Sequence, residues 1–164
     1  MSKVIFTTSV GDITIELDAA KAPGSCENFL KYLDAGHYDG TVFHRVISTF
    51  MIQGGGFTAD GKQKQVNKPI KNESSNGLKN LKYTLAMART SVADSATSQF
   101  FINAGNNAFL DKAESQDGVG YAVFGKVVAG TEVVDAIKGV KTTTKNGMSD
   151  WPVQDVMITS AKRA

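Results

Sequence analysis

The sequence predicts an all-β protein, a closed eight-stranded antiparallel barrel with a helix at each end. Short apolar segments separated by turn signals recur along the whole chain, which is typical of a β-barrel or sandwich. The predicted strands mostly follow one another directly, and this favours antiparallel pairing. A sheet of about eight strands in one small domain is expected to curl and close, because closure removes its edges.

Length and composition describe one ordinary globular domain over residues 1–164. The chain is 41% hydrophobic and 21% charged, and its formal net charge of +2 is too small to indicate nucleic acid. One cysteine excludes an intramolecular disulfide and a multi-cysteine zinc site. The first residues carry no export signal and no run is long enough to cross a membrane, so we expect a cytoplasmic protein.

The N-terminal elements are predicted to be a hairpin and a helix. Val4 to Thr8 and Asp12 to Asp18 are expected to be strands, the second with alternating apolar and polar residues. From Pro23 to Leu33 apolar residues follow at helical spacing, and Gly36 is a suitable stop. Cys26 falls on the apolar face of this helix and is predicted to be buried and unreactive.

The stretch from Phe43 to Phe57 holds the residues that suggest chemistry. It is mostly apolar, yet it contains His44, Arg45 and Gln53, which are costly to place in a half-buried strand without partners. It ends in three glycines, where the backbone needs unusual freedom. A concave apolar surface that holds a few fixed polar groups explains both features. We predict two strands here, with a turn at Ser48-Thr49.

The remaining chain alternates loops with short strands. Residues 60–82 are rich in lysine and poor in large apolar residues, which predicts a solvated loop; a phosphate-binding face is the alternative, disfavoured by the lack of aromatic residues. Further strands are predicted at Leu85 to Arg89, Ser98 to Asn103, Tyr121 to Val128 and Val156 to Ala161. A second helix is expected from Thr131 to Lys138, with Thr131 as its N-cap. The segment around Asn146-Gly147 is interpreted as turn-rich.

No motif of covalent or phosphate chemistry is present in the sequence. It has no nucleophile elbow, no phosphate-binding loop and no dinucleotide fingerprint. A hydrolytic triad based on His44 is an alternative, but no pattern orders its partners, and a buried imidazole explains this residue better. An arginine and two glutamines among Phe, Met and Leu suit a reaction that forms no bond to the protein. Rotation about an X–Pro peptide bond is such a reaction, because a fixed donor can favour its twisted midpoint.

Six blocks of the sequence closely resemble the cyclophilin-type peptidyl-prolyl cis–trans isomerases, especially the bacterial members. These blocks are Phe43–Ile47, Phe50–Gly55, Ile70–Glu73, Leu85–Thr90, Ser95–Asn103 and Val123–Val127. The resemblance implies the same fold, an eight-stranded antiparallel barrel capped by two helices. It also implies prolyl isomerase (rotamase) activity that assists protein folding and uses no cofactor and no metal.

The resemblance assigns roles to individual residues. Arg45 is implied as the catalytic residue, with Gln53 as its support and His44 behind it in a supporting layer. The implied substrate-binding residues are Phe50, Met51, Gln53, Ala88, Arg89, Gln99, Phe101, Phe109, Leu110 and Tyr121. Of these, Ala88 and Arg89 are expected to act through their backbone groups. Without the resemblance, Phe50, Met51, Phe101 and Leu110 would be interpreted as core residues, although the loop position of Phe109 and Leu110 favours a place in the site.

The sequence departs from the family's common pattern at four places. Ser48-Thr49 replaces a Pro-Gly turn, and Tyr83 stands where glycine is common. Tyr121 replaces a histidine at the pocket rim, where we expect a modest effect. Phe109 replaces a tryptophan that many eukaryotic members use to bind cyclosporin, so we expect only weak cyclosporin binding.

The expected partners are proline-containing peptides and unfolded or flexible protein segments. We expect a monomer that binds neither nucleic acid nor membrane. Two alternatives to an enzyme remain: a module that only binds proline-containing segments in the same groove, and a chaperone-like protein with an exposed apolar surface. Arg45 favours the enzyme, because holding a proline ring needs only an apolar cup.

Overall fold

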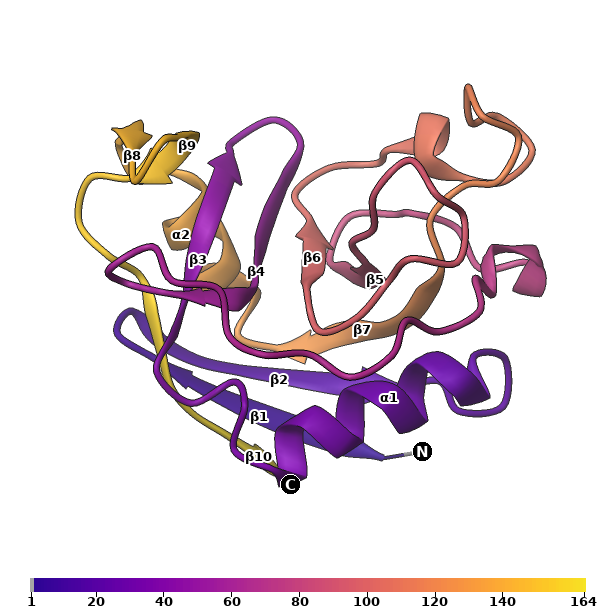
Figure 1. Cartoon of the computed structure of the whole chain (residues 1–164), viewed down its shortest axis with the longest axis horizontal. Helices are drawn as coiled ribbons and strands as arrows, with labels where there is room; N and C mark the ends of the chain where they lie inside the picture. Colours follow the sequence, from indigo (N-terminus) through magenta and orange to yellow (C-terminus); the bar gives the residue numbers. More distant parts are fainter. Residues whose placement is uncertain (1) are drawn as a thin grey trace.

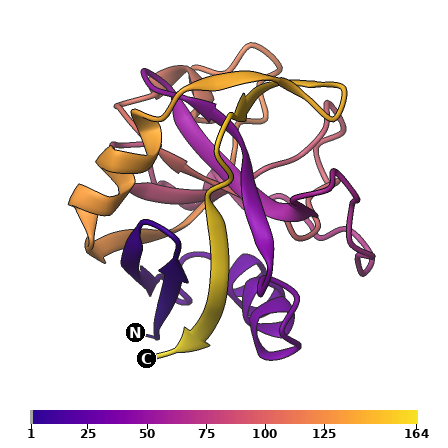
Figure 2. The ribbon, with the colours of Figure 1, turned by 90° about the vertical axis from the view of Figure 1, so that its left-hand side faces the viewer.

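The predicted closed barrel is present in the computed structural model, which describes residues 2–164 (Figure 1). Within these residues, eight strands close in the order β1-β10-β3-β4-β6-β5-β7-β2, and all neighbours are antiparallel. The strands are β1 Lys3–Thr8, β2 Gly11–Leu17, β3 Thr41–Ile47, β4 Met51–Thr58, β5 Thr84–Met87, β6 Phe100–Asn103, β7 Val123–Ala129 and β10 Met157–Arg163. The last strand pairs with β1, so the two ends of the chain lie close together (Figure 2).

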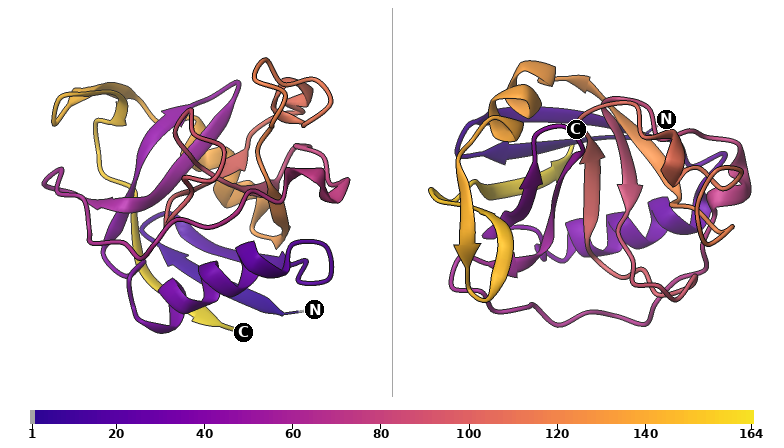
Figure 3. Two further views of the ribbon diagram at one scale, coloured as in Figure 1. Left: turned by 45° about the vertical axis from the view of Figure 1, so that its right-hand side comes forward. Right: turned by 90° about the horizontal axis from the view of Figure 1, so that it is seen from above.

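Two α-helices lie well apart on the barrel within the described residues (Figure 3). Helix α1 spans Pro23–Asp34 and begins at its proline, as predicted. Helix α2 spans Thr131–Lys138. The prediction that Thr131 is the N-cap is wrong by one residue. Gly130 is the N-cap, with a φ of 87°, and a Cβ there would collide with the Asp12 carbonyl oxygen, so only glycine fits.

Apolar side chains form two separate clusters. The larger one fills the barrel and includes aromatic residues from β1, α1 and β6, among them Phe6, Phe29 and Phe100. The smaller one contains Met51, Phe101 and other residues of β4, β5, β6 and β7. Successive side chains of a strand point to opposite faces, so the neighbours of Met51 and Phe101 reach the barrel interior while these two lie on its outer face.

A hairpin outside the barrel corrects the prediction of a turn-rich segment. Strands β8, Thr142–Lys145, and β9, Met148–Pro152, pair with each other beside β3 (Figure 1). Asn146 and Gly147 have φ angles of 54° and 76°, as an Asn-Gly turn of type I′ requires. The hairpin places Trp151 in a fully buried position.

Two long segments, residues 59–83 and 104–122, are irregular apart from short 3₁₀ turns, and the first of them matches the loop predicted at residues 60–82. These turns are Ser74–Asn76 and Ala108–Leu110. Glu73 fixes the first loop to α1, because its carboxylate accepts hydrogen bonds from the backbone N–H groups of Gly24 and Ser25 at 3.1 and 2.6 Å. No helix within residues 2–164 is long and apolar enough to span a membrane.

Candidate active site

A small pocket opens over the smaller apolar cluster, on the outer face of the barrel. It encloses about 120 Å³, and it is lined by Arg45, Phe50, Met51, Gln53, Ala88, Arg89, Phe101, Leu110 and Tyr121. Liquid water occupies about 30 Å³ per molecule, so the pocket has room for one small ring rather than for a large ligand. The structure thus brings together most residues that the family resemblance singled out. Gln99 and Phe109 lie next to the pocket, because Gln99 accepts a hydrogen bond from Gln53 and Phe109 packs against Phe50.

An irregularity in β3 places Arg45 on the outer face. Phe43 pairs with Gly54 and Arg45 pairs with Gln53, so β3 moves on by two residues where β4 moves on by one. The extra residue, His44, is the residue of a β-bulge. The bulge allows Phe43 to stay in the core while Arg45 lies opposite Gln53 beside the pocket.

The guanidinium of Arg45 is held by a short chain of glutamine side chains. Its Nη1 donates to Gln53 Oε1 at 3.5 Å, at the long end of the hydrogen-bonding range, and Gln53 Nε2 donates to Gln99 Oε1 at 2.9 Å. Arg45 is exposed, and among residues 2–164 it forms no ion pair with a carboxylate. Its positive charge is therefore oriented but not neutralised.

The glycines after Gln53 make room for this chain. A Cβ on Gly56 would lie 2.6 Å from Cγ of Gln99, and it would displace the glutamine that holds Gln53. Gly55 has a φ of 93°, and a Cβ there would collide with the rings of Phe100 and Tyr38. The backbone freedom predicted for this stretch is thus needed for packing around the site.

Aromatic pairs form the walls of the pocket. The rings of Phe101 and Tyr121 meet edge to face with centroids 5.7 Å apart, and those of Phe50 and Phe109 lie 5.5 Å apart. Phe109 is 56% exposed, which suits contact with a ligand. The turn at Ser48-Thr49 closes without Pro-Gly, since the N–H of Phe50 donates to the Ile47 carbonyl at 2.9 Å.

The side chain of Arg89 has a role that the sequence did not reveal. It is 2% exposed, stacks on the ring of Tyr121 at 4.3 Å, and donates to the Gly120 carbonyl and to Asp117 Oδ2, each at 2.8 Å from Nη2. The hydrogen bond from Arg89 to Asp117 is the main reason that the pKa of Asp117 lies well below its usual range. The N–H of Ala88 is also engaged, because it donates to the Gln99 carbonyl at 3.1 Å.

His44 does not support Arg45 in the expected way. Its ring packs against Phe57 and Trp151, with centroids 4.6 and 5.9 Å away, beneath the β8–β9 hairpin. Its Nδ1 is buried and has no hydrogen-bond partner in the described part of the chain, and the pKa falls to about 4, chiefly through burial. The bulge turns His44 toward the hairpin and away from the pocket.

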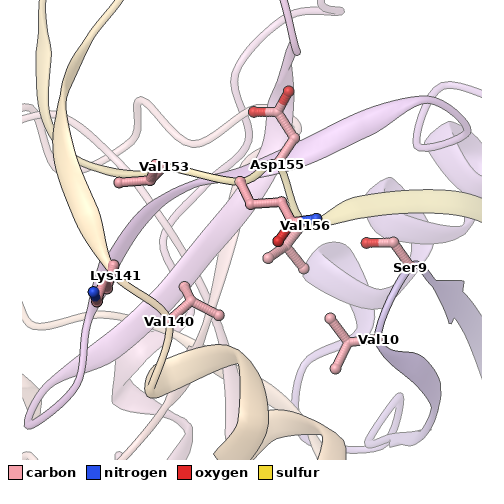
Figure 4. A pocket seen from close by; sticks show the side chains of 8 residues that line it. Ser9, Val10, Val140, Lys141, Val153, Asp155 and Val156 are labelled. Carbon is pink, nitrogen blue, oxygen red and sulfur yellow. The ribbon is translucent and has the colours of Figure 1, made fainter.

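A larger crevice elsewhere lacks comparable chemistry. It encloses about 460 Å³ between the β1–β2 turn, the end of α2 and the segment before β10, and Val10, Val140 and Val153 line it (Figure 4). Asp155 is the acidic residue of its lining, and its carboxylate is already paired with Lys145 at 3.2 Å. Lys141 also lines the crevice, but no ion pair or side-chain hydrogen bond within residues 2–164 orients its charge. The crevice therefore presents mainly apolar surface rather than an oriented charge.

Comparison with known proteins agrees with the geometry of the pocket. The family model "Cyclophilin type peptidyl-prolyl cis-trans isomerase/CLD" matches residues 3–163. The peptidyl-prolyl cis-trans isomerase cyp18 of Streptomyces antibioticus is 60% identical over 163 residues, which cover 99% of this chain and 98% of that protein. Peptidyl-prolyl cis-trans isomerase B of Escherichia coli is 54% identical and covers 96% of both chains.

A solved structure shows the same fold. The crystal structure of a cyclophilin-type isomerase of Cryptosporidium parvum, determined in the presence of the dipeptide Ala-Pro, superposes with a TM-score of 0.80. The two chains are 27% identical, and the match covers 99% of this chain and 98% of the other. By its sequence, its fold and its full-length relatives, this chain belongs to the cyclophilin-type peptidyl-prolyl cis–trans isomerases.

Proposed function

We propose that this isomerase lowers the barrier to X–Pro rotation with one charged donor, Arg45, placed beside an apolar cup for the proline ring. The position of the Arg45 guanidinium supports the proposal. It lies at the edge of the pocket, it is oriented by Gln53, and no carboxylate within residues 2–164 neutralises it. A positive donor that is fixed beside an apolar pocket suits a site where charge develops during reaction.

The chemistry of the bond explains why one donor is sufficient. Rotation about a peptide bond breaks amide resonance, and the barrier is about 20 kcal/mol. At the twisted midpoint the proline nitrogen regains its lone pair and can accept a hydrogen bond. In our proposal Arg45 donates to this nitrogen or to the proline carbonyl, and this interaction is stronger at the midpoint than in either planar isomer.

The walls of the pocket define the proposed substrate contacts. Phe50, Met51, Phe101 and Leu110 would surround the ring, with Phe109 and Tyr121 at the rim. Gln53 and Gln99 would meet the backbone on the side of Arg45. Arg89 would present its own backbone to the residues before proline. Ala88 would act there through its carbonyl, because its N–H is already donated to Gln99.

The proposed substrates are proline-containing peptides and flexible or unfolded protein segments. The C. parvum relative was crystallised in the presence of Ala-Pro, and a pocket of about 120 Å³ fits one ring of an extended chain. A folded domain could offer its prolines only in exposed loops. Cytoplasmic location and a monomeric state stay predictions from the sequence.

Replacing Arg45 tests the proposal. Arg45→Ala is expected to lower kcat/KM for a short Ala-Pro peptide by about 10²–10³, the effect of losing one fixed donor. Arg45→Lys keeps the charge but loses the planar fork, so we expect an intermediate value. NMR exchange measurements on the peptide give the rates. Arg163→Ala removes an exposed arginine paired with Asp34, away from the pocket, and is the matched control.

The same measurement separates an enzyme from a binding module. A binding module would hold the peptide without raising its interconversion rate, with or without Arg45. If folded Arg45→Ala turns over the peptide as fast as the unaltered protein, the proposed donor lies elsewhere.

Weak cyclosporin binding is proposed to result from Phe109. Phenylalanine lacks the indole N–H of the tryptophan found in many eukaryotic relatives, and it is smaller. Phe109→Trp is therefore expected to tighten cyclosporin binding, measured by titration calorimetry. No gain in affinity would mean that the loop holding residue 109 differs in geometry from those relatives.

A further inference from the structure

A chain of three buried asparagine side chains runs behind the pocket. Asn80, Asn103 and Asn107 are 1%, 0% and 5% exposed. Asn107 Nδ2 donates to Asn103 Oδ1 at 2.8 Å, and Asn103 Nδ2 donates to Asn80 Oδ1 at 3.0 Å and to Thr84 Oγ1 at 2.9 Å. Amides in such a chain fix one another's orientation, because each donor needs the next acceptor.

The two ends of this chain of asparagines reach two different parts of the pocket lining. At one end Asn107 Nδ2 donates to the carbonyl of Phe50 at 2.8 Å. At the other end Asn80 Nδ2 donates to the carbonyl of Tyr121 at 3.3 Å and to Asp111 Oδ1 at 3.1 Å. Phe50 and Tyr121 come from segments that are far apart in the sequence, and both line the pocket.

Backbone hydrogen bonds tie Leu110 into the same framework. The N–H of Leu110 donates to the Asn107 carbonyl, and the N–H of Tyr121 donates to the Leu110 carbonyl, each at 2.9 Å. The N–H of Asn107 in turn donates to the Asn80 carbonyl at 2.8 Å. Three residues that line the pocket are thus anchored to one buried polar framework.

Stability alone is a weak reason for such a framework. Buried amides lose their hydration, and well-packed apolar residues of the same shape can be equally stable in such a position. Directional hydrogen bonds specify a single spacing between the groups that they join, and apolar packing fixes such a spacing less well. The spacing specified here is that between the walls of the pocket.

We propose that Asn103, at the centre of this chain, is a positioning residue that sets the spacing between the Phe50 wall and the Leu110–Tyr121 wall. This inference rests on the proposed function, because it takes the pocket to be the proline-ring site. Asn103 touches no substrate in this proposal. It acts through Asn107 and Asn80, and it affects how tightly the ring is held rather than the donation by Arg45.

Asn103→Ala tests the proposal, with Asn28→Ala as the matched control. Asn28 lies on α1 rather than behind the pocket. It is also buried, with 7% of its surface exposed, and its Nδ2 donates to the Thr97 carbonyl at 2.7 Å. Affinity for an Ala-Pro tetrapeptide is measured by NMR titration, and the exchange rate is measured at saturation. Aromatic NMR signals of Phe50 and Tyr121 report the position of the two walls.

We expect Asn103→Ala to weaken peptide affinity about tenfold and to shift both ring signals, while the rate at saturation changes far less. Arg45→Ala should show the opposite result, in which the exchange rate at saturation falls while peptide affinity is retained. Failure of the proposed function is therefore recognised separately from failure of this inference. If Asn103→Ala lowers thermal stability as Asn28→Ala does but leaves affinity and ring signals unchanged, the asparagine chain is only structural.

A second variant covers the case in which Asn103→Ala does not fold. Asn107→Ala removes the hydrogen bonds to the Phe50 carbonyl and to Asn103 Oδ1, but it leaves those from Asn103 to Asn80 and Thr84 in place. The Phe50 carbonyl keeps a hydrogen bond from the Ala104 N–H at 2.9 Å. The same loss of affinity and the same shift of the Phe50 signals support the proposal. Unchanged affinity in folded Asn107→Ala overturns it.

Discussion

A single bulge in β3 separates the roles of two neighbouring residues. Arg45 lies at the pocket, whereas His44 is buried between Phe57 and Trp151 under the β8–β9 hairpin. The imidazole of His44 is buried, and its Nδ1 has no hydrogen-bond partner within residues 2–164, so it resists protonation; the positive charge of Arg45 adds to this effect. We therefore expect His44 to link the stability of the fold to pH, whereas Arg45 lies at the pocket.

The pH dependence of stability tests this reading of His44. Its pKa is about 4 in the folded protein against the ordinary value of 6.5, so the unfolded chain binds a proton more readily as pH falls. The free energy of unfolding should thus lose about 3 kcal/mol through His44 between pH 6.5 and pH 4, at 1.36 kcal/mol per unit of pKa. Urea titrations at several pH values measure it. His44→Leu should remove this part of the pH dependence; an identical slope in the variant would contradict the assignment.

Single residues also show what could be predicted from the sequence. Arg45 and Gln53 stood out because polar side chains in an apolar strand require a reason. The side chains of Arg89 and Asn103 gave no such signal, because their partners lie elsewhere in the chain or within polar loops. Residue type and spacing describe a strand, but they do not describe which distant carbonyl a side chain reaches.

At the scale of elements, the long loop of residues 104–122 is held against the sheet by a few specific contacts. Arg89, which follows β5, donates to Asp117 and to the Gly120 carbonyl of this loop and stacks on Tyr121.

The sequence pattern did not predict the β8–β9 hairpin, which also depends on contacts between separate segments. Both strands are short and β8 is wholly polar, and pairing with each other and packing on β3 give them their structure.

Loosening this loop is expected to weaken substrate binding. Asp117→Asn removes the charge that Arg89 pairs with, so the guanidinium and the Tyr121 ring beneath it become less ordered. We expect KM for an Ala-Pro peptide to rise several-fold while kcat changes little, since Arg45 is untouched. Asp34→Asn breaks another arginine–aspartate pair, with Arg163 at 2.7 Å, and should leave both constants unchanged. Equal effects of the two substitutions would show that the loop does not depend on this ion pair.

For the molecule as a whole, the closed barrel followed from the pattern of strands, but the location of the site did not. Alternation shows that Met51 and Ile52 face opposite ways, but not which of them faces the barrel interior. Only closure of the sheet settles this, with Ile52 in the core and Met51 in the outer cluster. The pocket therefore depends on long-range pairing that joins the two ends of the chain.

Closure by the last strand can be tested by truncation. A chain that ends after Val156 lacks β10, which pairs with both β1 and β3 and buries Ile158 and Ala161. We expect it to lose cooperative urea unfolding, followed by Trp151 fluorescence, because β1 and β3 become open edges and the core is exposed. A chain that ends after Lys162 loses the exposed end of β10 and the exposed Arg163–Asp34 ion pair, but no buried residue, and should unfold cooperatively near the midpoint of the full chain. Cooperative unfolding of the shorter chain would mean that the barrel is stable without closure, and the pocket should then still bind an Ala-Pro peptide.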